Sequence, residues 1–162
     1  MNPSAAPPPP PPAPLAGDRS VTGAVAMLHV RDVEASARFY QLLGLERQNQ
    51  VTLPDGTPVW QWMGRRGANV MLSRASGPID AANQAALLYL YVPDVHALRA
   101  HLLAAGLRDG GPFTGAGPLT TSTVFAVSHP HHMPGGELRI HDPDGWCLLV
   151  GSTRQPIGAW PE

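Results

Sequence analysis

Apolar and polar residues alternate along this chain with two different periods, and the order of these periods predicts its helices and strands. Apolar residues recur at helical spacing in residues 32–44 and again in residues 94–106. The recurring residues are Val33, Ala37, Tyr40 and Leu43 in the first segment, and Val95, Leu98, Leu102 and Ala105 in the second. Each segment begins with an Asp that can cap a helix and ends with a Gly that can terminate one. We therefore expect two helices of about 12 residues, each covering one face of a sheet.

Strand-like runs surround both predicted helices. An apolar run precedes each helix, and further runs follow near residues 59–63 and 69–74 in the first half, and near 123–127, 137–141 and 146–151 in the second. Turn signals at Asp55-Gly56 and at Asp142-Pro143-Asp144-Gly145 separate neighbouring runs. Each half of the chain therefore reads as a β-α-β-β-β unit.

The two halves are also related in sequence, as an internal repeat with a shift of 62 residues from Asp32 to Asp94. Without a gap, Leu28, Val30, Asp32, Val33, Ala35, Gly44 and Leu45 match the identical residues Leu90, Val92, Asp94, Val95, Ala97, Gly106 and Leu107. One such unit cannot cover its own sheet, so two copies are expected to join. The expected fold class is α+β, with two tandem β-α-β-β-β modules forming a curved mixed sheet around a cleft and the helices outside.

The length of 162 residues suits one domain with a well-buried core. We expect this domain at residues 21–152, with modules at about 21–78 and 84–152. Residues 1–20 contain six consecutive prolines from Pro7 to Pro12 and are expected to form a disordered tail. Residues 153–162 are expected to form a short C-terminal tail.

Charge and composition exclude several kinds of partner and chemistry. The formal net charge is -1, and all 11 basic residues are scattered arginines, so nucleic acid is not an expected partner and a lysine Schiff base is impossible. Cys147 is the only cysteine, which excludes an intramolecular disulfide and favours the cytoplasm. The chain has no apolar run of about 20 residues, so a membrane is not an expected partner either.

Two motifs resemble those of a known superfamily. Residues 30–45 carry Asp32, Ser36, Phe39-Tyr40 and Leu43-Gly44-Leu45, and residues 141–149 carry Asp142-Pro143-Asp144-Gly145 before an apolar run. With the duplication, they resemble the vicinal-oxygen-chelate superfamily, which contains glyoxalases, extradiol dioxygenases and bleomycin-resistance proteins. The resemblance covers about residues 21–152 and implies the fold described above. It does not select one activity.

Metal-dependent members of that superfamily place His, Gln or Glu seven residues before each helix-capping Asp, and a carboxylate or similar ligand in the last strand of each module. The matching residues here are Val25, Leu87, Met71 and Leu149. None of them supplies an oxygen or imidazole ligand, and a thioether suits softer metals. The resemblance therefore implies the branch without a metal site, and we expect neither a metal nor another cofactor.

Strand alternation predicts which side chains face the cleft. The expected ligand-binding residues are Met27, His29, Trp60, Trp62, Met71, Tyr89, Tyr91, Glu137, Arg139 and His141. Aromatic and sulfur-containing side chains with a few polar groups are typical of a small-molecule pocket. The alternative is that the Trp and Tyr residues fill the core or a dimer interface.

Glu137 and His29 are the candidate acid–base residues, although an ion pair with Arg139 is the simpler interpretation of Glu137. His129, His131 and His132 could bind a metal, but a Pro- and Gly-bounded loop more often leaves such residues solvated.

We therefore expect a cytoplasmic, homodimeric protein that binds a small aromatic or amphipathic molecule in a metal-free cleft. Bleomycin itself is not expected, because the small net charge gives no sign of an acidic groove for a cationic drug. The alternative is a lyase, isomerase or dioxygenase-like enzyme that uses Glu137 or His29, or an atypical metal site. A third possibility is a regulatory module that uses its proline-rich tail for interaction.

Overall fold

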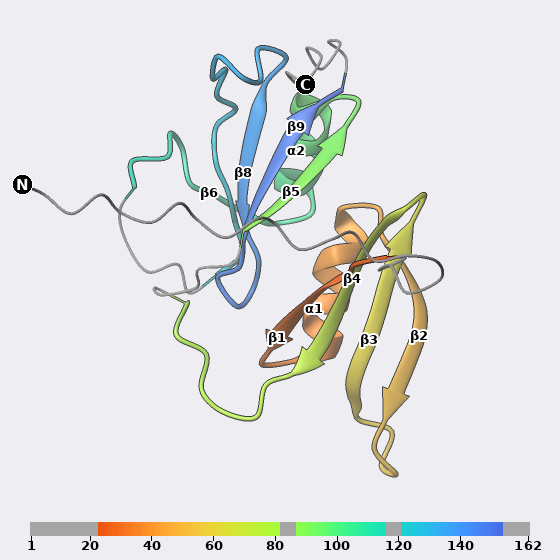
Figure 1. The fold of residues 1–162 in the computed structure, drawn as a ribbon. Helices are drawn as coiled ribbons and strands as arrows, with labels where there is room; N and C mark the ends of the chain where they lie inside the picture. The colour runs from red at the N-terminus through yellow and green to blue at the C-terminus, as the bar shows by residue number, and fades with distance from the viewer. Residues whose placement is uncertain (1–22, 82–86, 116–120, 154–162) are drawn as a thin grey trace, which may run out of the picture.

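Two modules, each with one helix packed on one sheet, make up the described part of the chain (Figure 1). The computed structural model describes residues 23–81, 87–115 and 121–153. The predicted N-terminal tail and all but the first residue of the predicted C-terminal tail lie outside these residues.

The first module contains β1 (Ala26–Val30), α1 (Val33–Leu42), β2 (Glu46–Thr52), β3 (Pro58–Arg65) and β4 (Ala68–Arg74). Its strands lie in the order β1-β4-β3-β2, with β1 parallel to β4 and the other pairs antiparallel. The second module contains β5 (Leu87–Val92), α2 (Val95–Ala104), β6 (Arg108–Asp109), β7 (Thr123–Val124), β8 (Glu137–His141) and β9 (Cys147–Ser152). Its strand order is β5-β9-β8-β7-β6. The predicted α+β class and the tandem β-α-β-β-β modules are confirmed.

Both helices begin and end as their sequences predict. The carboxylates of Asp32 and Asp94 accept hydrogen bonds from the backbone N–H of Ala35 and Ala97, at 3.0 and 2.9 Å. After each helix a glycine with positive φ reverses the chain. No helix in the described part of the chain is long and apolar enough to cross a bilayer.

Strand alternation separates a buried face from an open face in both sheets. Leu28 and Val30 on β1, and Leu138 and Ile140 on β8, are at most 2% exposed and pack in the core on the helix side. The residues between them point to the opposite face, which no helix of the described chain covers (Figure 1). These open faces carry the side chains that strand alternation predicted to face the cleft.

Two strands and one boundary were not predicted. β2 is a polar edge strand with the sequence ERQNQVT, and β6 is only two residues long, so neither shows an apolar alternation. β7 ends at Val124, three residues before the end of the predicted run. The strands form two separately hydrogen-bonded sheets, in which β1 and β5 are edge strands.

The hairpin between β8 and β9 joins the modules. Its Asp144 carboxylate accepts hydrogen bonds from the Arg31 backbone N–H and Nε, at 3.1 and 2.5 Å. The Tyr40 hydroxyl of α1 donates to Asp142 at 3.3 Å. The Trp146 indole N–H donates to the His29 carbonyl at 2.9 Å. These contacts fix the second module against β1 and α1 of the first.

Candidate ligand-binding site

The ten predicted ligand-binding residues lie on the two open faces, five on each module. Met27, His29, Trp60, Trp62 and Met71 lie on β1, β3 and β4, whereas Tyr89, Tyr91, Glu137, Arg139 and His141 lie on β5 and β8. Among the described residues, no hydrogen bond, ion pair or ring contact joins a member of one group to a member of the other. The predicted residues therefore fall into two separate groups, one on each module.

The second module arranges its open face in cross-strand rows. Tyr91 pairs with Gly151, which pairs with Glu137, and in the next row Leu149 lies between Tyr89 and Arg139. Residues directly opposite on neighbouring strands have their side chains close together. The middle strand, β9, thus decides how far the side chains of β5 and β8 can approach each other.

Gly151 opens the middle of this face. A Cβ at this position would lie 2.7 Å from Cε of Met133 and 3.1 Å from Cε1 of Tyr89. Without a side chain there, the Tyr89 ring lies across β9 and its hydroxyl donates to Glu137 Oε2 at 2.7 Å. His132 Nε2 lies 3.2 Å from the same oxygen. The Tyr89 hydroxyl from β5 and the His132 ring from the loop before β8 therefore both contact the Glu137 carboxylate.

The prediction of an ion pair between Glu137 and Arg139 is wrong. Within the described segments, Glu137 contacts Tyr89 and His132, while Arg139 Nη1 donates to the Cys147 thiol at 2.9 Å. Carbon Cζ of Arg139 lies 4.0 Å from the centre of the Phe113 ring. The Glu137 carboxylate is bound by Tyr89 instead of Arg139, because Gly151 allows the Tyr89 ring to cross β9.

Burial controls the protonation of the groups around Arg139. Desolvation raises the pKa of Tyr89 and of the Cys147 thiol above their ordinary values, so both keep their protons at neutral pH. Desolvation, and then the charge of Arg139, lower the pKa of His141 below its ordinary value of 6.5. The His141 Nε2 atom is buried and has no hydrogen-bond partner in the described chain.

The first module presents an aromatic face with little charge. Trp60 and Trp62 are half-buried, and their rings meet edge to face with centres 6.3 Å apart. The Trp62 indole N–H donates to Asn69 Oδ1 at 3.0 Å. Gly64 makes room for this bond, because a Cβ there would collide with the Asn69 oxygen. Two large rings are thereby held on the open face of the sheet.

Met27 and His29 lie at the edge of this face. They line a shallow groove of about 520 Å³ together with residues 75–80 and Trp146. Met27 is 53% exposed. His29 is also exposed, and it lies apart from Glu137, on the other module. The two candidate acid–base residues are therefore not brought together within one chain.

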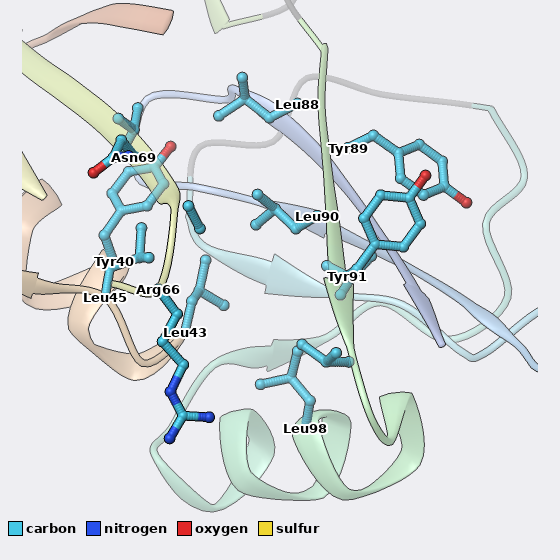
Figure 2. Close-up of a pocket in the computed structure, with 14 residues that line it drawn as sticks. Tyr40, Leu43, Leu45, Arg66, Asn69, Leu88, Tyr89, Leu90, Tyr91 and Leu98 are labelled. Carbon is cyan, nitrogen blue, oxygen red and sulfur yellow. The ribbon is translucent and has the colours of Figure 1, made fainter. Parts of the chain in front are cut away.

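Sequence reasoning missed a pocket of about 480 Å³ between the modules, on the helix side of β5 (Figure 2). Leu43, Leu45, Leu88, Leu90 and Leu98 give it an apolar lining, and Arg66 is its one charged residue. Figure 2 shows Tyr89 and Tyr91 on the other side of β5, pointing away from Leu88 and Leu90. Apolar residues of this kind resemble ordinary core positions in a sequence, so no local signal identified the pocket.

The four superfamily metal positions do not fit a divalent ion. Met71 and Leu149 lie half-buried on the open faces, Met71 opposite Met27 and Leu149 opposite Tyr89. Val25 precedes β1, and Leu87 begins β5. Three aliphatic side chains and one thioether offer no ligand that Zn, Ni, Mn or Fe prefers at such a site.

The three-histidine loop forms no metal cluster in the described part of the chain, where no group of three His, Cys, Asp or Glu could hold an ion. His129, His131 and His132 are all exposed, as expected for a solvated loop. The His129 ring lies 6.0 Å from that of His96, and His132 contacts Glu137.

Comparison with known proteins identifies the family. The model of the Glyoxalase/Bleomycin resistance protein/Dioxygenase superfamily matches residues 24–149, so the chain belongs to this superfamily. No curated protein matches the chain significantly.

Solved structures confirm the fold. A bleomycin-binding protein in complex with bleomycin is 19% identical, with a TM-score of 0.62 over 82% of this chain and 99% of that one. A bleomycin resistance determinant encoded on transposon Tn5 is 18% identical, with a TM-score of 0.62 over 83% and 100%. TnmS3, an antibiotic binding protein from Streptomyces sp. CB03234, is 18% identical, with a TM-score of 0.53 over 83% and 98%. At these identities the likeness establishes the fold alone.

Proposed function

We propose that this protein binds a small aromatic or amphipathic molecule in a metal-free cleft and leaves it chemically unchanged. The observation that carries the proposal is the pair of open aromatic faces. Tyr91 is 47% exposed and its ring centre lies 5.2 Å from that of Tyr89, while Trp60 and Trp62 stand together on the other module. Aromatic side chains that remain partly exposed on an uncovered sheet face are typical of small-molecule sites.

The similar structures support this class of function. Their names describe a bleomycin-binding protein with bleomycin and an antibiotic binding protein. The residues at the superfamily metal positions point the same way, because they cannot hold a catalytic divalent ion.

A homodimer would complete the cleft. The two groups of residues would each act as a half-site, since no hydrogen bond, ion pair or ring contact joins them in the described part of one chain. A two-fold axis can place the first module of each chain against the second module of its partner. Two equivalent clefts then form, each lined by tryptophans from one chain and tyrosines from the other. The single cysteine, half-buried at Cys147, supports a cytoplasmic location.

A screen of planar aromatic compounds by tryptophan fluorescence tests the proposal. Compounds that bind should quench the fluorescence saturably and raise the melting temperature by mass action. We expect Trp60→Ala or Tyr91→Ala to weaken binding by about 1–3 kcal/mol, because each removes a stacking surface. Leu53→Ala is the control, since Leu53 is 40% exposed and lies outside the strands. Equal loss in all three variants, or no saturable binding, contradicts the proposal.

The second candidate is a lyase or isomerase in which Glu137 acts as the acid or base. The contacts of its carboxylate with Tyr89 and His132 favour this alternative, since a histidine next to a carboxylate is typical of proton transfer. Glu137→Gln separates the candidates because it keeps the shape and removes the charge. A binding protein should return its ligand unchanged in both forms. Chemical conversion by the wild type that disappears in Glu137→Gln would establish the enzyme.

A further inference from the structure

One described arginine is partly buried without a carboxylate partner. Five of the nine described arginines form ion pairs with Asp or Glu: Arg31, Arg38, Arg47, Arg65 and Arg99. Of the other four, Arg66, Arg74 and Arg108 are exposed, whereas Arg139 is half-buried on the open face of the second module. An uncompensated charge that has lost part of its water is costly, so this position favours an anion.

The neighbours of Arg139 orient its guanidinium without neutralising it. The Phe113 ring lies against it at 4.0 Å, and the Cys147 thiol accepts one of its five N–H groups. Because burial raises the thiol pKa, Cys147 stays uncharged at neutral pH. The guanidinium therefore keeps free donors in the planar fork that matches a carboxylate.

The carboxylate nearest in sequence is already engaged. Glu137 Oε2 is held by the Tyr89 hydroxyl at 2.7 Å and by His132 Nε2 at 3.2 Å. The strands that carry the first group of aromatic side chains bring no alternative, because β1, β3 and β4 contain no Asp or Glu. The proposed dimer would thus place an aromatic face, and no acid from these strands, opposite Arg139.

We infer that Arg139 binds the carboxylate of an aromatic monoanion whose ring lies among the aromatic side chains of the two faces. The inference rests on the proposed function and names the class of its ligand. A monoanion fits because Arg139 is the one arginine among the ten predicted ligand-binding residues, and because the lowered pKa of His141 keeps that neighbour uncharged at neutral pH. A second negative charge would meet the Glu137 carboxylate two residues away along β8.

Isothermal titration calorimetry of the full chain tests this inference with three probes that share one ring system. They are 2-naphthoate, its neutral methyl ester and the cation 2-naphthylmethylammonium. Charge-assisted hydrogen bonds should make the carboxylate bind about 10- to 100-fold more tightly than the ester, and the cation more weakly still. Arg139→Gln should abolish this preference. Arg139→Lys, which keeps the charge but not the fork, should reduce it.

Arg74→Gln is the matched control. It removes the same charge from an exposed arginine that shares the core-facing side of β4 with Leu72, opposite the Trp face. The carboxylate preference should survive in this variant. Equal binding of the three probes, or a preference that persists in both Arg139 variants, overturns the inference and leaves the proposed function standing. Failure of all three probes to bind overturns both.

Discussion

At the scale of single residues, two glycines in strands allow the polar contacts of the open faces. Gly151 lets Tyr89 cross β9 to Glu137, and Gly64 gives Asn69 room to accept the Trp62 indole N–H. Both glycines lie in the interior of strands, where glycine weakens the strand and often marks a close approach of other atoms. In each module an aromatic side chain is held by a hydrogen bond that a side chain at the glycine would obstruct.

Gly151→Ala should therefore destabilise the protein by about 1–2 kcal/mol, because the added methyl group forces Tyr89 and Met133 to move. Urea denaturation measures this cost. The control is Gly23→Ala, where the structure shows open space around the new Cβ and no positive φ. If both variants lose the same free energy of unfolding, the absence of a side chain at Gly151 is not what allows Tyr89 to cross β9.

At the scale of elements, the two helices should respond alike to loss of their caps. Asp32→Ala and Asp94→Ala each remove one side-chain acceptor at a helix N-terminus, at a cost of about 1 kcal/mol. Asp32→Ser and Asp94→Ser keep an acceptor and should recover most of that stability. Chemical denaturation of the four variants checks the result, and equal stability of the Ala and Ser forms would contradict it.

The hairpin between β8 and β9 is the element that joins the modules, and its stability should depend on pH. Asp142 is 1% exposed, and desolvation raises its pKa from 3.8 to about 7 despite hydrogen bonds from the backbone N–H groups of Asp144 and Trp146. A folded-state pKa above the unfolded value stabilises the protein most at low pH. This contribution is lost as the pH rises through about 7.

We therefore expect the free energy of unfolding of the wild type, minus that of Asp142→Asn, to decrease as the pH rises from 4 to 8. The slope should be at most about 1.4 kcal/mol per pH unit. The comparison with Asp142→Asn is needed because His141 acts oppositely. Its lowered pKa removes stability as the pH falls below its ordinary value of 6.5. A constant difference between wild type and variant across this range would show that Asp142 ionises freely.

Local signals explain which elements were predictable. Helix caps, terminating glycines and apolar periodicity act within a few residues, so both helices and the strands β3, β4, β8 and β9 follow from the sequence. Polar β2 lacks that signal because it is an exposed edge strand. Alternation correctly placed Glu137 and Arg139 on one face, but it could not reveal that Tyr89 and His132 take the carboxylate. Tyr89 lies 48 residues from Glu137, and the loop that brings His132 back to the carboxylate has no apolar periodicity.

At the scale of the whole molecule, the absence of metal ligands at the superfamily positions has a direct consequence. Purified protein should contain no stoichiometric divalent ion, and a chelator should leave its melting temperature unchanged, because Val25, Met71, Leu87 and Leu149 cannot hold one. Elemental analysis with native mass spectrometry measures this. One bound ion per chain, lost in Glu137→Ala or His141→Ala, would contradict it.

In the proposed dimer, each ligand site combines the first module of one chain with the second module of its partner. A binding titration of mixed variants checks this arrangement. Trp60→Ala and Tyr91→Ala proteins are each expected to bind weakly, but a heterodimer of the two contains one cleft with both aromatic residues intact. After equal amounts are unfolded and refolded together, half of the dimers should be heterodimers with one intact cleft of two, giving about a quarter of the wild-type sites at wild-type affinity. Recovery of no wild-type sites, with heterodimers present, would place the site within a single chain.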